Sequence, residues 1–376
     1  MEKPPSLASD LQERLAQSIR AQGGWIGFDR FMELALYAPG LGYYSRDDRQ
    51  IGALAQGRPG GSSDFATAPV ISPLFGRALA VQVGQALACT ATDAVWEFGA
   101  GTGALAAQLL QELGERVRSY TIVDLSGSLQ QRQRATLAPF ADKLHWVSRL
   151  PGELHGVLLG NEVLDAMPVQ LLARVAGQWH ERGVALGPEG LPCWQDRATA
   201  LRPPLAVEGT HDYLTEIHAQ AEGFMRTLVD RLVQGALFLL DYGFPEREYY
   251  HPQRAGGTVM CHRAHRADPD PLRDIGAKDI TAHVNFTGIA LAAQEAAAQR
   301  GCADAWHLLG YTSQAHFLFN CGLGPLLESA SLAERSMAHR LVAEHEMGEL
   351  FKVIGFCRGA PFDAVGFAHG DRSHTL

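Results

Sequence analysis

The stretch Trp96–Ala106 reads WEFGAGTGALA, with a glycine at every second position from Gly99 to Gly103. The apolar run AVWEF leads into it, and a helical pattern begins near Thr102. Glycines in a strand-to-helix turn permit dihedral angles that other residues avoid, and they let the backbone approach a ligand closely. The stretch therefore predicts a Rossmann-like α/β fold whose ligand lies at this turn.

Strands and helices continue to alternate beyond the turn. Apolar strand patterns recur at 120–124, 144–148, 155–160 and 235–243. Such alternation predicts a parallel sheet. A last apolar run, FKVIGFCRG, is expected to form an antiparallel edge of the same sheet.

The periodicity also divides the chain into regions. Helical patterns at 7–22 and 27–37 precede a turn-rich segment, and an alanine-rich helical pattern covers 288–299. We expect an N-terminal helical and loop cap at 1–90, a Rossmann-like core at 91–260, a helical insertion lobe at 261–345 and a C-terminal strand returning to the core sheet at 346–376.

Composition excludes several classes of partner. The 376 residues carry a formal net charge of -9, so there is no basic field to attract nucleic acid. No apolar run approaches the length of a membrane span, and the N-terminal residues resemble no targeting signal. The six cysteines form no CxxC pair, which argues against a disulfide framework and a thiolate zinc cluster. We expect a cytoplasmic protein.

Two cofactor classes fit the glycine turn. The run GAGTGA matches the dinucleotide pattern G-x-G-x-x-[GA], which leaves a nicotinamide-dependent oxidoreductase as an alternative. Gly103 and the strand-end Glu97 favour S-adenosylmethionine (SAM), because a carboxylate there suits an ammonium or sulfonium cation rather than a pyrophosphate. Asp124 lies about 20 residues beyond the glycines, the spacing of an acid that binds ribose hydroxyls with either cofactor. Glycines that serve only tight packing are a third interpretation.

A second polar stretch, GNEVLDAMPV at 160–169, follows the strand pattern at 155–160. Ligands of open α/β sheets bind beyond the carboxyl ends of the strands, so Asn161, Glu162 and Asp165 are expected there. Glu162 and Asp165 are three residues apart and would share a face of a turn or helix. Two carboxylates on one face can hold a guanidinium and orient one of its nitrogens. Helix capping is the competing interpretation for Asp165.

The sequence resembles the MidA-like proteins, which include a mitochondrial complex I assembly factor that acts as a protein arginine methyltransferase. The resemblance covers nearly the whole chain. It is carried by LYAPGLGYY (36–44), DFATAPVISPLFG (64–76), EFGAGTG (97–103), NEVLDAMP (161–168), DYGFPEREYYHPQRAGGTVMCHRAH (241–265) and DITAHVNF (279–286).

The resemblance implies a class I SAM-methyltransferase sheet with a helical N-terminal segment and a helical insertion. Three positions depart from the family pattern: Val70 where Glu is frequent, Ala100 where Pro is common, and Asn285 where Asp is usual. No guanidinium-binding role is therefore expected at 70 or 285, and the substrate need not be the one best known for the family.

The residues and the resemblance together predict a SAM-dependent methyltransferase that acts on arginine in a protein, by resemblance a respiratory-complex subunit. The alternatives are the oxidoreductase and a non-catalytic SAM-binding assembly chaperone. The predicted cofactor residues are Glu97, Gly99, Gly101, Gly103, Asp124, Asn161, Asp64 and Thr67; the catalytic residues are Glu162 and Asp165; the substrate-binding residues are Tyr43 and Tyr44.

No metal is predicted. Cys261, His262, His265 and Asp268, with His251 and His283 nearby, include ligand types but lie in a segment broken by proline and glycine, without the spacing that fixes zinc geometry.

Overall fold

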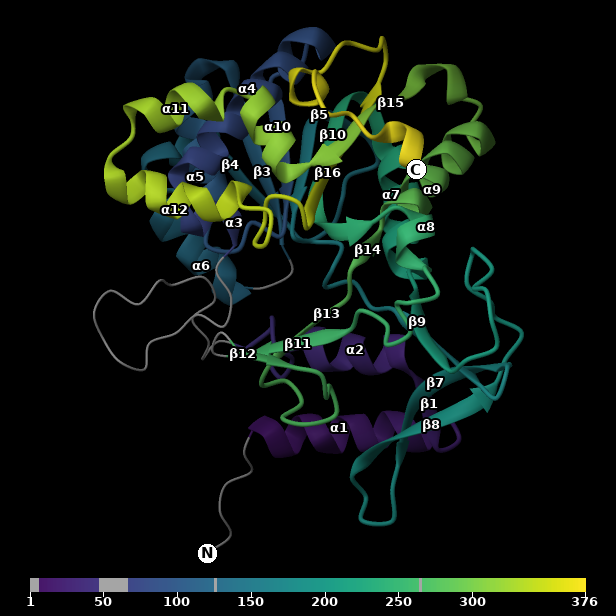
Figure 1. Ribbon diagram of the computed structural model, residues 1–376. Coiled ribbons are helices and arrows are strands. Elements are labelled where there is room, and N and C mark those ends of the chain that lie inside the picture. Colours follow the sequence, from purple (N-terminus) through teal and green to yellow (C-terminus); the bar gives the residue numbers. More distant parts are fainter. Residues whose placement is uncertain (1–6, 47–66, 125–126, 264–265) are drawn as a thin grey trace, which may run out of the picture.

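The computed structural model describes residues 7–46, 67–124, 127–263 and 266–376. Figure 1 shows an α/β body above a lobe that contains the N-terminal helices. The predicted cofactor residue Asp64 lies outside the described residues.

The body is built on one twisted sheet. In order across it, the strands are β15 (Trp306–Ser313), β16 (Phe351–Arg358), β10 (Leu232–Phe244), β5 (Leu154–Asn161), β2 (Ala94–Phe98), β3 (Ser119–Val123) and β4 (Leu144–Val147). The strands from β10 to β4 are parallel, so their carboxyl ends meet at one edge. The predicted parallel α/β sheet is confirmed.

The C-terminal strand β16 pairs antiparallel with β10, as predicted, but its expected place at the edge is wrong. β15 pairs antiparallel with the other side of β16 and forms the edge instead. The burial of β16 agrees with an internal position, since every residue from Phe351 to Cys357 is buried.

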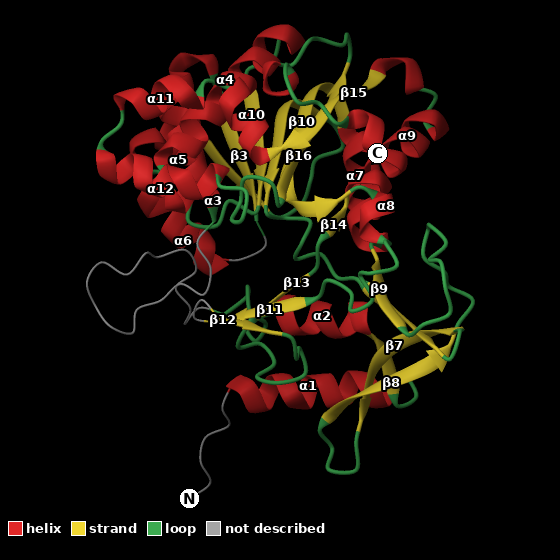
Figure 2. Ribbon diagram, in the orientation of Figure 1, coloured by secondary structure: helices red, strands yellow, loops and turns green. Residues whose placement is uncertain are grey.

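Helices cover both faces of the sheet (Figure 2). One face packs against α4 (Pro73–Thr90), α5 (Ala104–Leu113), α10 (Gln314–Asn320), α11 (Leu323–Ser329) and α12 (Leu332–Val342), and the other against α7 (Ala219–Arg231) and α9 (Phe286–Gln299). In α5, Leu105, Leu109 and Leu113 recur every four residues and bury one stripe against the sheet. The helix α6 (Gly127–Thr136) follows β3.

The lobe combines segments that are far apart in the sequence. Its helices are α1 (Leu7–Ala21) and α2 (Phe28–Tyr37), close to the predicted bounds. Its strands are β1 (Trp25–Gly27), β6 (Gln170–Val175), β7 (Gln178–Leu186), β8 (Pro192–Ala198) and β9 (Tyr213–Ile217) in one antiparallel sheet, and β11 (Met260–Arg263), β12 (Arg266–Asp268) and β13 (Asp279–Thr281) in another. The strands at 170–217 have no counterpart in the sequence prediction.

Short elements join body and lobe. They are α3 (Ala68–Ile71), α8 (Glu246–Tyr249) and β14 (Val284–Asn285), which adds to the end of β10. The carboxyl ends of the parallel strands point toward the lobe (Figure 1), so the loops after β2, β5 and β10 lie between the two parts. Among the described residues, no helix combines the length and apolar character that a membrane span requires.

Candidate active site

The glycine turn after β2 depends on left-handed backbone angles. The φ angles are +62° at Gly99, +52° at Gly101 and +82° at Gly103, where only glycine is free of strain. Gly103 is the N-cap of α5. A Cβ atom on Gly101 would meet no atom within 4 Å, so this part of the backbone faces open space.

A narrow pocket lies over this turn. Its lining includes five predicted cofactor residues, namely Thr67, Glu97, Gly99, Gly101 and Asn161. Pro69 and Val70 of α3 close it from the opposite side. Its volume is about 40 Å³.

Two predicted cofactor residues, Gly103 and Asp124, lie beside the pocket rather than in its lining. Asp124 is buried directly after β3 and accepts a hydrogen bond from Gln133 Nε2 at 2.8 Å. The same nitrogen donates to the carbonyl oxygen of Gly101 at 3.1 Å. Gln133, which the sequence analysis did not single out, therefore connects the strand-end acid to the glycine turn.

Glu97 is buried at the end of β2, with 3% of its surface exposed. Tyr120 donates a hydrogen bond to Glu97 Oε2 at 2.7 Å. Burial raises the pKa of Glu97 to about 7, the Tyr120 bond opposes this rise, and the charge of Asp124 adds to it. A cation in the pocket would favour the ionised carboxylate.

Glu162 follows β5 in a turn and not in a helix. Its φ angle is +55°, which is unusual for a residue with a side chain. Glu162 Oε1 accepts bonds from the Ala68 N–H at 3.3 Å and from Asn161 Nδ2 at 3.0 Å. Glu162 Oε2 and Asn161 Oδ1 are buried without a hydrogen-bond partner. Two unpaired acceptors next to the pocket mark a place for a donor or cation.

Burial raises the pKa of Glu162 to about 8. The charge of Asp165 adds to this rise, while the two accepted hydrogen bonds oppose it. Asp165 is 5% exposed, and burial raises its pKa to about 6 despite a hydrogen bond from Tyr242. Neither carboxyl group caps a helix.

Two further carboxyl groups lie at this site that the sequence analysis did not select. Asp241 on β10 is fully buried and accepts backbone bonds from the turn after β5. Asp279 on β13 accepts a hydrogen bond from Tyr44, whose hydroxyl lies 2.9 Å from both carboxylate oxygens. The sequence does contain a signal for Asp241, because this residue directly follows the apolar run ALFLL near the carboxyl end of a parallel strand.

The lobe supplies aromatic side chains to the acid cluster. The rings of Tyr37 and Tyr44 stack with centroids 5.6 Å apart, and the Tyr37 hydroxyl donates to the Ala166 carbonyl at 2.8 Å. Tyr43 is 3% exposed and packs edge-on against Tyr44 within the core of the lobe. Tyr44 therefore reaches the acids directly, whereas Tyr43 stands behind it.

The cluster brings several acids together in a buried place. Within the described parts of the chain, no lysine or arginine forms an ion pair with Glu162, Asp165 or Asp241. Buried carboxylates without a counter-charge are costly unless a ligand supplies one. A planar cation with several N–H donors would satisfy both the charge and the unpaired oxygen.

A metal ion has no comparable site. Across the described residues, no group of three or more His, Cys, Asp and Glu side chains could hold one. Cys261 is buried in the core of the lobe, and His265 lies outside the described residues.

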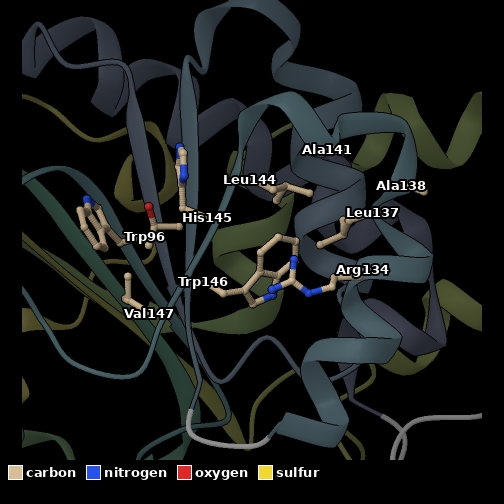
Figure 3. A pocket seen from close by; sticks show the side chains of 10 residues that line it. Trp96, Arg134, Leu137, Ala138, Ala141, Leu144, His145, Trp146 and Val147 are labelled. Carbon is tan, nitrogen blue, oxygen red and sulfur yellow. The ribbon is translucent and has the colours of Figure 1, made fainter.

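A larger pocket of about 770 Å³ runs along the edge strand β4. Figure 3 shows Trp96 and His145 on one side of this strand and Trp146 and Arg134 on the other. Among the described residues that line it, none is a predicted cofactor or catalytic residue. The pocket lies at the edge of the sheet and reaches Val147, the last residue of β4, and Leu137, which lies beside Gly103 of the glycine turn.

The pH dependence of stability tests the raised pKa of Glu162 without a ligand. In Glu162→Gln the amide oxygen can accept the two bonds of Oε1, but the group cannot ionise. The folded wild type keeps the carboxyl proton of Glu162 between about pH 4.5, the ordinary pKa of this group, and about pH 8. The unfolded chain loses that proton over the same range. Wild-type stability therefore falls relative to the variant as pH rises through this window.

We expect the Tm of Glu162→Gln, relative to wild type, to increase from about pH 5 to about pH 8.5 in thermal unfolding. Glu189→Gln, at an exposed glutamate, serves as the control and should show no such trend. A Tm difference for Glu162→Gln that stays constant with pH would show that Glu162 ionises as it does in water.

Comparison with known proteins agrees with this geometry. Residues 75–302 match the model of the family described as "Putative S-adenosyl-L-methionine-dependent methyltransferase". A crystal structure of a Burkholderia thailandensis protein, described as a "likely methyl transferase" and bound to S-adenosyl-homocysteine, is 45% identical in sequence. The alignment covers 100% of this chain and 99% of that one, with a TM-score of 0.92.

Curated relatives are more distant. The mitochondrial protein arginine methyltransferase NDUFAF7 of Danio rerio is 26% identical, over 91% of this chain and 84% of its own length. Its Caenorhabditis elegans homolog is 27% identical, over 76% of this chain and 73% of its own length. Because the family model spans more than half of the chain, and the Burkholderia structure matches all of it, the chain belongs to this family of S-adenosyl-L-methionine-dependent methyltransferases, the MidA-like family that its motifs indicate.

Proposed function

We propose that the chain methylates a nitrogen of an arginine side chain in a protein substrate. Membership of the family supports SAM-dependent methyl transfer and leaves no support for the nicotinamide-dependent alternative. The observation that carries the arginine assignment is the buried acid cluster, in which Glu162 Oε2 has no partner. The names of relatives about 25% identical to the chain also support the arginine assignment.

The residues around the glycine turn suit the chemistry of the cofactor. When bound, SAM supplies the methyl group. Gly99 and Gly101 let the backbone approach the ligand, and Glu97 offers a negative charge to its cationic end. Asn161 Oδ1 is a buried acceptor in need of a donor, and the Asp124 carboxylate suits ribose hydroxyls.

Glu162 and Asp165 act on the acceptor. Their carboxylates can bind N–H groups of the guanidinium and fix one nitrogen in line with the methyl group, which lowers the entropic part of the barrier. As this nitrogen gains its bond to carbon it loses one proton, and the guanidinium keeps its single positive charge. A carboxylate with a raised pKa, such as Glu162, is suited to accept that proton.

The lobe completes the acceptor side. Tyr44, held by Asp279, offers an aromatic ring near the acids, and such rings attract guanidinium groups. Tyr43 buttresses Tyr44. A respiratory-complex subunit as the substrate and a cytoplasmic location both stay predictions.

Gly101→Val tests the cofactor pocket. The side chain would fill the space where backbone and ligand meet, so we expect SAM affinity to fall by on the order of 100-fold or more in calorimetry. Gly301→Val is the matched control, because Gly301 also has a positive φ angle, +66°, and open space around it but lies after α9. A folded Gly101→Val protein with wild-type affinity would remove the glycine turn from the cofactor site.

Arginine methylation is tested with an arginine peptide, SAM and mass spectrometry. Glu162→Gln should leave SAM affinity within a few-fold but slow single-turnover methylation by on the order of 100-fold, through lost orientation and lost proton acceptance. Asp165→Asn should act in the same direction, less steeply. An assembly chaperone that only binds SAM would show no turnover in the wild type, and its partner assembly would survive both substitutions.

A further inference from the structure

The Asp241 side chain makes more hydrogen bonds with the turn that carries Glu162 and Asp165 than with its own strand. Its side chain is fully buried, and Oδ2 accepts the Leu164 N–H at 2.9 Å and the Asp165 N–H at 3.2 Å. Its other oxygen, Oδ1, accepts the N–H of Tyr242 at 2.9 Å. One carboxyl group therefore satisfies two consecutive amides of the turn between Glu162 and Asp165.

Other hydrogen bonds also support the turn. The Glu162 N–H donates to the Leu240 carbonyl at 2.8 Å, and the Ala282 N–H donates to the Asp165 carbonyl at 2.9 Å. Glu162 itself has a left-handed φ angle, a conformation that persists only where surrounding bonds impose it. Without Asp241, the amides of Leu164 and Asp165 would lose the acceptor that holds them in this buried turn.

We propose that Asp241 is the positioning residue of the acceptor site, which holds the Glu162–Asp165 turn so that both carboxylates face the substrate nitrogen. The inference rests on the proposed function for its catalytic readout. Asp241 itself acts through the main chain and touches no reacting atom.

The same surroundings affect the ionisation of Asp241. Burial, and then the charges of Asp165 and Glu162, raise the pKa of Asp241 well above its usual range. The other titratable groups around the cluster are Tyr242 on β10, Asp279, Tyr37 and Tyr44 from the lobe, and Lys352 on β16. The backbone of Lys352 pairs with that of Asp241, and its amine contacts Glu349. Asp241 therefore resists ionisation, and Asn, a neutral group of the same shape, can replace it as the acceptor of both amides.

Two substitutions test the positioning role. Asp241→Asn keeps an oxygen that can accept both amides, and Asp241→Ala removes it. With an arginine peptide, we expect Asp241→Ala to lower kcat/KM by on the order of 100-fold with SAM affinity within a few-fold. Asp241→Asn should recover most of that loss. Asp230→Ala, at a half-exposed surface aspartate, is the control.

A second measurement needs no acceptor. The pH-dependent stability gain of Glu162→Gln should persist in the Asp241→Asn background and disappear in Asp241→Ala, because the released turn exposes Glu162 to water. An Asp241→Ala protein with wild-type kcat/KM and an intact stability gain would overturn the positioning role, as would an Asp241→Asn protein as impaired as Asp241→Ala. If the wild type leaves arginine peptides unmodified while the stability gain still depends on Asp241, the proposed function fails and the positioning role stands. If Asp241→Ala does not fold, Asp241→Asn decides, since a kcat/KM lowered by on the order of 100-fold in that variant would overturn the role of Asp241 as an amide acceptor.

Discussion

Several carboxyl groups are buried together at the carboxyl ends of β5 and β10, and no described lysine or arginine forms an ion pair with them. The properties of the site follow from this constraint. Burial holds the pKa of Glu162 near 8 and that of Asp165 near 6, so the cluster carries less negative charge than the same groups would carry in water. A cationic ligand would reverse this balance, because it favours the ionised forms. Binding of the acceptor and ionisation of the acids are therefore one coupled equilibrium.

The fold is what allows such a cluster to form. Parallel strands end at one edge, which places Glu97, Asn161 and Asp241 near the carboxyl ends of neighbouring strands and Glu162 directly after β5. The lobe then covers this edge and contributes Tyr44 and Asp279. Glu162 links the acid cluster to the cofactor pocket, because its Oε1 accepts a hydrogen bond from Asn161, which lines that pocket. Ligands in the two places are thus expected to influence each other.

The sequence predicts local features of this site well and long-range ones poorly. The glycine turn, Glu97 and Asn161 are recognisable because a strand, a turn and a helix follow one another in a short stretch, and all three features meet in one pocket. Asp279 reaches the site only through the packing of the lobe, and β15 lies outside β16 only through long-range pairing, so periodicity cannot place them. Asn285 caps α9 through its side-chain oxygen, a role that Asp can also fill, which explains why that departure from the family pattern is tolerated.

The proton balance of acceptor binding tests the guanidinium site most directly. An arginine peptide is titrated by calorimetry at about pH 7 in two buffers of different ionisation enthalpy, with S-adenosyl-homocysteine present so that no methyl group can be transferred. Since Glu162 is largely protonated at that pH, a guanidinium bound by its carboxylate predicts release of on the order of one proton, lost in Glu162→Gln. Binding without proton release, or with the same release in wild type and Glu162→Gln, would contradict a guanidinium site built on Glu162.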